Sequence, residues 1–163
     1  MVIRDAVGEE DRSVEPFDGH LALLGGAGAG FVAAVAMGLT FVLFEPALLR
    51  DYVPGLYGFA GNLVVGWLAH LGHGILFGLV FAVVMDDPSL VSVSGRIWTA
   101  VLAGVVFGIV LAVVGTGIVL PMWSRAAGLS PAPAIPFVTA ALLVGHVVFG
   151  AVLGALFHVV DRL

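Results

Sequence analysis

The chain of 163 residues is 61% hydrophobic and only 10% charged, with a formal net charge of −5. Its mean hydropathy of +1.17 excludes an ordinary soluble domain of this length and predicts a protein that resides in the lipid bilayer. Because the sequence contains no cysteine and no lysine, it excludes disulfides, thiol chemistry, Schiff bases and a Walker-type phosphate loop. The acidic, apolar composition also predicts that nucleic acid is not a partner.

Residues 1–19 are predicted to form a disordered acidic tail. They include six acidic residues and two arginines but few large apolar side chains, so burial cannot offset the entropy lost on folding. The acidic start also differs from a cleavable signal peptide, in which a basic region is followed at once by a short apolar core. We therefore expect one transmembrane domain over residues 20–163.

Four apolar stretches follow, and each is longer than the ~20 residues that a helix needs to cross ~30 Å of hydrocarbon. They are apolar on all sides, whereas strands of a transmembrane barrel are about half as long and alternate in polarity. The sequence therefore predicts an all-α integral membrane protein with four transmembrane helices. The predicted spans are, approximately, Leu21–Phe44, Phe59–Met85, Trp98–Leu120 and Pro136–Val160.

The distribution of arginine predicts the orientation of these helices. With both termini on one face, that face carries four arginines and the opposite face carries two, namely Arg4, Arg12, Arg96 and Arg162 against Arg50 and Arg125. The positive-inside rule then predicts a multi-pass protein of the cell membrane with cytoplasmic termini.

The second and fourth stretches share the pattern H-x3-G-x3-G-x2-F-x-V-V at an offset of 76 residues, with six identities in fifteen positions. At an offset of 74 residues, Gly30 of the first stretch aligns with Gly104 of the third. The loops "PALLR" and "PMWSR" both place proline four residues before arginine. We infer a duplicated helical hairpin, with repeat 1 at about residues 21–85 and repeat 2 at about 97–160. Two parallel repeats predict a pseudo-two-fold axis along the membrane normal.

Small residues recur at four-residue spacing along all four predicted helices. Residues at this spacing lie about 40° apart around a helix, so each set forms a shallow groove in which a neighbouring backbone can approach closely. We expect these contacts within the monomer, and the alternative is contact between subunits of a homo-oligomer. The predicted packing glycines are Gly26, Gly30, Gly38, Gly74, Gly78, Gly104, Gly108, Gly150 and Gly154.

His70, His73 and His146 form a candidate intramembrane polar site. His70 and His146 lie about ten residues into their predicted helices, which is about 15 Å deep, and the repeat places them on equivalent faces. Two imidazoles could therefore meet at the centre of the bundle. His73 lies about one helical turn further along.

Three interpretations of the histidines are open. Neutral imidazoles can form hydrogen bonds that fix helix register, or the three residues can form a path for protons or small solutes. Alternatively, His70 and His146 can be the axial ligands of haem b, with the adjacent glycines beside the macrocycle. A zinc site is not expected, because no carboxylate lies at the depth of the histidines.

Other polar residues are few. Glu45, at the end of the first predicted helix, is expected to be an interfacial carboxylate, or alternatively a protonatable gate. Asn62 and Thr116 are expected to satisfy local backbone groups, and the triplet "GTG" at 115–117 predicts a distorted helix end.

The segments "HLGHGILFG" and "HVVFGAVLG", together with "GAGAGFVAAVAMGL", resemble small uncharacterised four-helix membrane proteins of haloarchaea and other prokaryotes. The resemblance covers most of the membrane part and implies no particular activity. The chain also lacks the common catalytic motifs. We therefore expect a non-enzymatic membrane protein, either a structural or oligomer-forming component or a small transport unit. The alternative is a haem b electron-transfer protein.

Overall fold

The computed structural model describes residues 19–90, 93 and 95–160, and every regular element among them is a helix. The predicted acidic tail lies, apart from Gly19, outside the described residues. The long helices are α1 (Gly19–Phe44), α3 (Leu63–Met85), α5 (Ile97–Val110) and α7 (Ala140–Val160). The π-helix η3 (Leu111–Val119) continues α5 into α6 (Leu120–Ala126). The described residues also include the short elements η1 (Leu48–Tyr52), α2 (Val53–Gly55) and the 3-10 turn η2 (Pro88–Leu90).

Among the described residues, four helices are long and apolar enough to cross a membrane, which agrees with the predicted number of spans. They are Leu21–Phe44, Leu63–Met85, Ile97–Ala126 and Ala140–Val160. Their mean hydropathies of 2.0 to 2.6 indicate a multi-pass membrane protein by length and composition.

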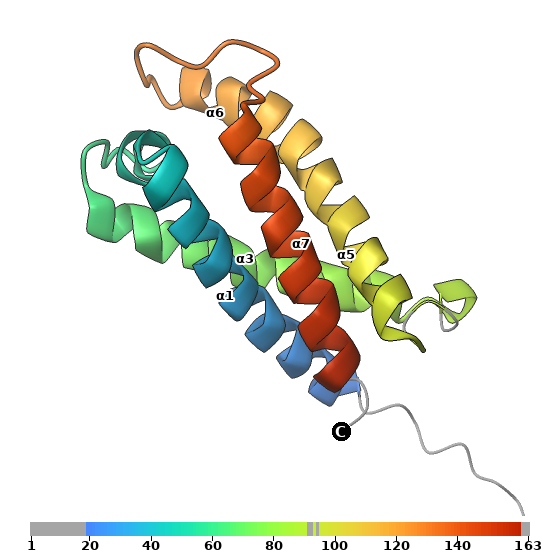
Figure 1. Cartoon of the computed structure of the whole chain (residues 1–163). Coiled ribbons are helices and arrows are strands. Elements are labelled where there is room, and N and C mark those ends of the chain that lie inside the picture. The colour runs from blue at the N-terminus through green and yellow to red at the C-terminus, as the bar shows by residue number, and fades with distance from the viewer. Residues whose placement is uncertain (1–18, 91–92, 94, 161–163) are drawn as a thin grey trace, which may run out of the picture.

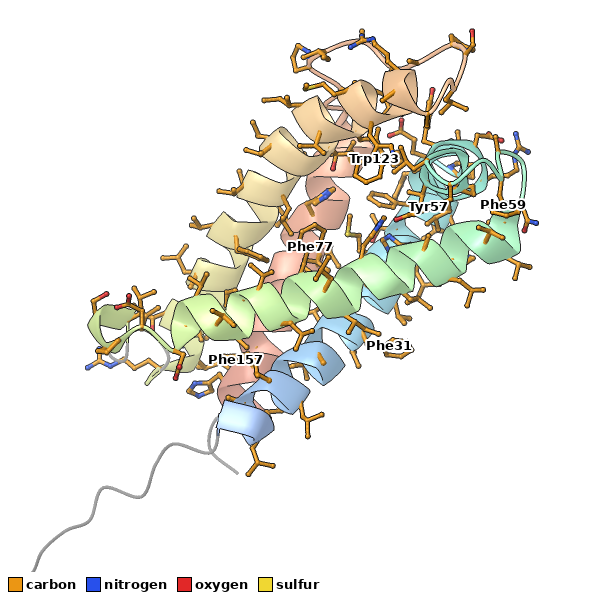
Figure 2. The ribbon with its side chains drawn as sticks, turned by 180° about the vertical axis from the view of Figure 1, so that it is seen from behind. Phe31, Tyr57, Phe59, Phe77, Trp123 and Phe157 are labelled. Carbon is orange, nitrogen blue, oxygen red and sulfur yellow. The ribbon has the colours of Figure 1, made fainter. Side chains whose placement is uncertain are left out.

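The helices form a bundle in which α1 packs against both α3 and α7, and α5 packs against α7 (Figure 1). Helix α3 crosses the other long helices at a large angle, as Figure 2 shows from the opposite side. Gly19 and Val160 lie at the same end of the bundle, which we call the terminal end. The opposite end, which we call the loop end, holds η1, α2, α6 and the loop 127–139.

Two helices begin later than the sequence predicts. Gly58 and Gly61 adopt φ angles of 82° and 88°, so α3 begins only at Leu63, after Asn62 accepts a hydrogen bond of 3.1 Å from Val65 N. Helix α7 begins at Ala140, after the Thr139 hydroxyl accepts a bond of 3.1 Å from Leu142 N. His70 and His146 therefore lie seven and six residues into their helices, instead of about ten.

The third span is distorted in its interior rather than at its end. The π-helix η3 includes the triplet of residues 115–117, and the N–H of Leu120 donates to the carbonyl of Gly115, five residues earlier. The carbonyl of Gly117 accepts a bond of 3.0 Å from Phe137 N, which ties the loop to η3. A π-helical stretch within an α-helix frequently accompanies a functional site.

Glycines bring the paired helices into backbone contact. A methyl group added at Gly30 would lie 2.8 Å from the Cα of Gly78, and one added at Gly104 would lie 2.9 Å from the N of Gly154. Both distances are too short for a side chain, so only glycine permits these contacts. The other predicted glycines of these two interfaces are also in such close contact, namely Gly26, Gly74, Gly108 and Gly150.

Other glycines are in close contact with side chains or with other parts of the backbone. Gly38, which the sequence analysis singled out, lies against Trp67 of α3, where an added methyl group would come within 2.5 Å of the indole. Gly66 lies against the carbonyl of Leu49, and Gly145 lies against the ring of Phe41. Gly66 lies two four-residue steps before Gly74, and because His70 occupies the step between them, the spacing of small residues did not single it out.

Candidate functional site

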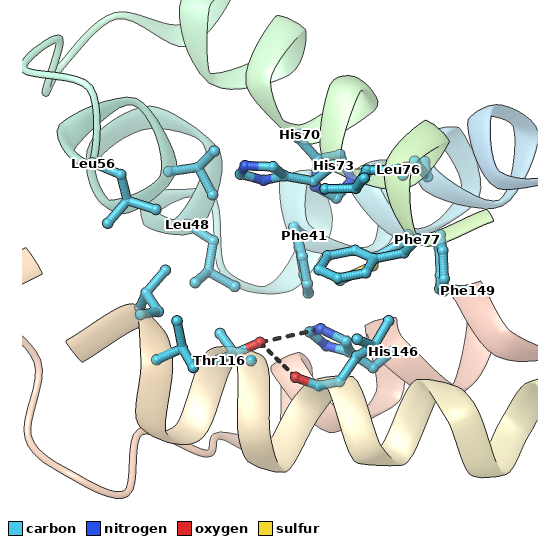
Figure 3. A pocket seen from close by; sticks show the side chains of 18 of the residues that line it. Phe41, Leu48, Leu56, His70, His73, Leu76, Phe77, Thr116, His146 and Phe149 are labelled. Atoms are coloured by element: carbon cyan, nitrogen blue, oxygen red, sulfur yellow. Dashed lines mark hydrogen bonds between the residues drawn. The ribbon is translucent and has the colours of Figure 1, made fainter. Parts of the chain in front are cut away.

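A cavity of about 390 Å³ lies in the half of the bundle nearer the loop end. All four spans and α2 contribute to its lining, which is mostly apolar (Figure 3). Its polar side chains are His70, His73, His146, Thr116 and Tyr57. The cavity therefore contains all three histidines that the sequence predicts as the candidate site.

Three phenylalanines pack together on the terminal side of the cavity. The ring of Phe81 lies 5.4 Å, between centroids, from the rings of both Phe107 and Phe157. Phe81 and Phe157 are almost fully buried. We call these three residues the phenylalanine floor. It joins α3 to α5 and α7, from which α3 diverges toward the loop end.

The cavity opens between α3 on one side and η3 and α6 on the other. Four of its lining residues border this opening, with exposed fractions from 47% to 55%, namely Tyr57, Leu76, Val119 and Trp123. We call these four residues the mouth. Figure 2 shows Tyr57 and Trp123 on facing sides of the gap, with Phe77 deeper between the helices.

Both ring nitrogens of His146 have partners. Nδ1 lies 2.9 Å from the carbonyl of Leu142, and Nε2 lies 3.1 Å from the hydroxyl of Thr116. Because a carbonyl only accepts, a neutral His146 carries its proton on Nδ1, and Nε2 accepts the hydroxyl proton of Thr116. Thr116 thus serves a buried histidine and not only its local backbone, because η3 turns it toward α7 (Figure 3).

His70 is bound on one side only. Its Nε2 lies 2.9 Å from the carbonyl of Ala34 on α1, so a neutral His70 carries its proton on Nε2. The indole of Trp67 packs edge-on against the imidazole at 6.0 Å between centroids. These two contacts hold the ring between α1 and α3 and leave Nδ1 as an acceptor.

Phe41 of α1 lies between the two histidines that were expected to meet. Its ring centroid is 5.8 Å from that of His70 and 6.1 Å from that of His146 (Figure 3). The ring therefore takes the space that a haem plane between the two imidazoles would need, and both Nε2 atoms are already in hydrogen bonds. These residues do not fit a bis-histidine haem.

His73 lies beside the mouth. Its Nε2 is 2.6 Å from the hydroxyl of Tyr57, which follows α2. This bond joins the loop at residues 56–62 to α3 beside the opening. Sequence analysis missed the pair because Tyr57 lies in a loop whose path cannot be derived from a residue pattern.

Glu45 lies outside the cavity. Its carboxylate accepts a hydrogen bond from the hydroxyl of Thr139, so it joins the end of α1 to the start of α7. A carboxylate beside the first turn of a helix is also stabilised by the helix dipole. This contact supports the interfacial role of Glu45 over that of a gate.

Within the described part of the chain, no three His, Asp or Glu side chains lie close enough together to hold a metal ion. Comparison of the chain with models of protein families, with curated proteins and with solved structures found no match. The cavity, its histidines and its mouth are therefore the features that bear on function.

Proposed function

We propose that this chain is a non-enzymatic, multi-pass protein of the cell membrane that acts as a small transport unit, binding a small solute in the cavity. The observation that carries the proposal is the cavity itself, which is open at the mouth and has the phenylalanine floor on its terminal side. Its size lies in the range of ~300–1,000 Å³ that is usual for small-molecule sites, and it combines an apolar lining with few polar groups. Polar residues inside a membrane commonly mark the path of a solute.

The proposal includes the duplication of a helical hairpin. Gly30 approaches Gly78 as Gly104 approaches Gly154, and these pairs correspond at offsets of 74 and 76 residues. Each hairpin is therefore a closely packed unit, α1 with α3 and α5 with α7. A tilt of one hairpin against the other about the contact of α1 with α7 would separate Phe81 from Phe107. Such a movement would open the floor as the mouth closes.

The proposed orientation places the mouth away from the cytoplasm. Cytoplasmic termini follow from the distribution of arginine, and the mouth belongs to the opposite, loop end. In this orientation the cavity receives its solute from the outer half of the bilayer or from the outer aqueous phase.

Because the chain has no cysteine, variants with one introduced cysteine can test whether a reagent reaches the cavity. Gly115 lines the cavity and Gly72 of α3 does not, and a side chain added at either meets nothing within 4 Å. In liposomes, we expect Gly115→Cys to react with methyl methanethiosulfonate, a small uncharged reagent that enters the bilayer, and Gly72→Cys, whose thiol lies outside the cavity, to stay unlabelled. If the chain is only a structural component with a closed bundle, both cysteines will be equally unreactive.

An absorption spectrum of the purified protein tests the alternative that the chain binds haem b. We expect the oxidised-minus-reduced spectrum of protein expressed with ample haem to be featureless, because Phe41 lies between the imidazoles. A Soret band that is lost in both His70→Ala and His146→Ala would instead establish haem b and electron transfer.

A further inference from the structure

Resting on the proposed function, we infer the chemical class of the ligand. It is an aromatic molecule that dissolves in the bilayer and carries a hydroxyl group, and that hydroxyl donates a hydrogen bond to Nδ1 of His70. The inference combines three features: the free hydrogen-bonding capacity of the cavity, its aromatic walls and the depth of its mouth.

Most polar groups in the cavity already bind one another. His146 donates to Leu142 and accepts from Thr116, so neither of its nitrogens is free. His73 and the Tyr57 hydroxyl share one bond of 2.6 Å. A ligand therefore meets few groups that still need a partner.

Two ring nitrogens in the cavity are exceptions, Nδ1 of His73 beside the mouth and Nδ1 of the more deeply buried His70, and the second is the acceptor that we assign to the ligand. It makes no hydrogen bond to any described residue, because the proton of this imidazole lies on Nε2 and is donated to Ala34. Among described side chains, the one buried polar atom without a partner is Ser124 Oγ, so Nδ1 of His70 is not enclosed and faces the cavity that His70 lines. A neutral imidazole nitrogen without a proton only accepts, so the ligand must supply a donor. Without one, this acceptor has no partner within a mostly apolar cavity, which carries a desolvation cost.

The walls around this acceptor favour a flat ring. Phe41, Phe77, Phe149 and Trp123 all line the cavity, and aromatic rings pack well against one another in offset or edge-on arrangements. Apart from the histidine group, the lining offers little to a charged or strongly polar solute.

The mouth reaches membrane depth, which favours access from lipid. Leu76 is half exposed and lies thirteen residues into α3, about 20 Å from the start of the helix. Val119 of η3 and Trp123 of α6 line the same cavity. A ligand dissolved in the hydrocarbon can therefore pass sideways between these helices without crossing the aqueous phase.

A pair of probes that differ in one hydrogen-bond donor tests the inference. 4-Bromophenol carries the hydroxyl, whereas 4-bromoanisole replaces its proton with a methyl group, and bromine quenches tryptophan fluorescence at short range. The reporter is a chain in liposomes that keeps only Trp123, with Phe at positions 67 and 98. A matched chain that keeps only Trp98, which is 81% exposed near the terminal end, measures quenching from the bilayer alone.

We expect 4-bromophenol to quench Trp123 saturably, with a half-saturating concentration about tenfold below that of 4-bromoanisole, and to quench Trp98 without saturation. His70→Leu should abolish the difference between the probes. Equal quenching of Trp123 by both probes, with Gly115→Cys still labelled, would overturn the ligand class while leaving the proposed function intact. Quenching of Trp123 no stronger than that of Trp98, with Gly115→Cys unlabelled, would overturn both.

The source of the ligand has its own test. 4-Hydroxybenzenesulfonate carries the same hydroxyl but stays in water. We expect it to leave the quenching of Trp123 by 4-bromophenol unchanged at concentrations at which unlabelled 4-cresol, which enters the bilayer, displaces the probe. Displacement by the sulfonate would show that the cavity is filled from the aqueous phase, which overturns the assignment to a bilayer ligand.

Discussion

The contact between α1 and α3 depends on the absence of a side chain at Gly30. A methyl group there would lie 2.8 Å from the Cα of Gly78 and closer still to the carbonyl oxygen of Gly74. Carbon atoms in contact lie about 3.5–4.0 Å apart, so Gly30→Ala must push the two helices apart by roughly 1 Å. Overpacking of this kind costs about 1–3 kcal/mol. Alanine also raises helix propensity by up to about 1 kcal/mol, which offsets part of that cost.

Gly28 supplies the matched control on the same helix, because an added methyl group there meets nothing within 4 Å. Gly28→Ala gains the same helix propensity without the overpacking. We therefore expect Gly30→Ala to be less stable than Gly28→Ala by about 1–3 kcal/mol, measured by unfolding in increasing dodecyl sulfate and followed by circular dichroism. Equal stability of the two variants would refute the account of glycine-dependent packing.

Three further substitutions test contacts at the loop end. Asn62→Ala removes the bond to Val65 N and should lower the free energy of unfolding by about 0.5–2 kcal/mol. Asn62→Asp keeps an oxygen acceptor and should leave that free energy nearly unchanged. Equal losses in both variants would show that Asn62 does not cap α3. Thr139→Val removes both the bond to Glu45 and the bond from Leu142 N and should lower the thermal midpoint, while Thr139→Ser should preserve it. Arg125→Gln removes a bond of 3.1 Å to the loop at residues 127–139, so limited proteolysis should cut that loop faster, and an unchanged rate would contradict this role.

The four spans and their packing faces could be predicted because a membrane imposes simple requirements on each residue. A span must be apolar over ~20 residues, and a close backbone contact needs glycine. Both requirements can therefore be recognised in a short stretch of the sequence. The start of α3 was harder, since it depends on Gly58 and Gly61 turning the chain before Asn62. The residues that meet in the cavity were harder still to predict from the sequence. The bond from Tyr57 to His73 joins residues whose proximity depends on the path of a loop.

The position of Phe41 between the histidines has a similar cause. Equivalent faces of α3 and α7 would bring the imidazoles together only if nothing stood at the bundle centre. Helix α1 packs against both of these helices, so its own side chains occupy that centre. Sequence symmetry between His70 and His146 carries no information about this third helix.

In the duplication that we propose, η3 has a simple origin. Gly30 aligns with Gly104 at an offset of 74 residues, but Pro46 aligns with Pro121 at an offset of 75, so the third span holds one extra residue between these points. A π-helix bonds each residue to one five positions away instead of four, and it can therefore absorb an extra residue while the flanking turns keep their faces. The third span is π-helical at Leu111–Val119, which lies between the same points.

Deletion of Gly115 should therefore be tolerated. It would restore a regular α-helix through η3 and leave the glycines of α5 against α7, at the expense of the contact from Thr116 to His146. Deletion of Gly28 is the control, because it has equally open surroundings but lies in a regular α-helix. That deletion would turn Gly26 about 100° away from Gly30 and break the contact with α3. We expect the Gly115 deletion to elute as a folded, monodisperse protein in detergent with a thermal midpoint near that of the parent, and the Gly28 deletion to aggregate. Equal damage from both deletions would show that η3 is needed by the bundle itself rather than being the mark of an inserted residue.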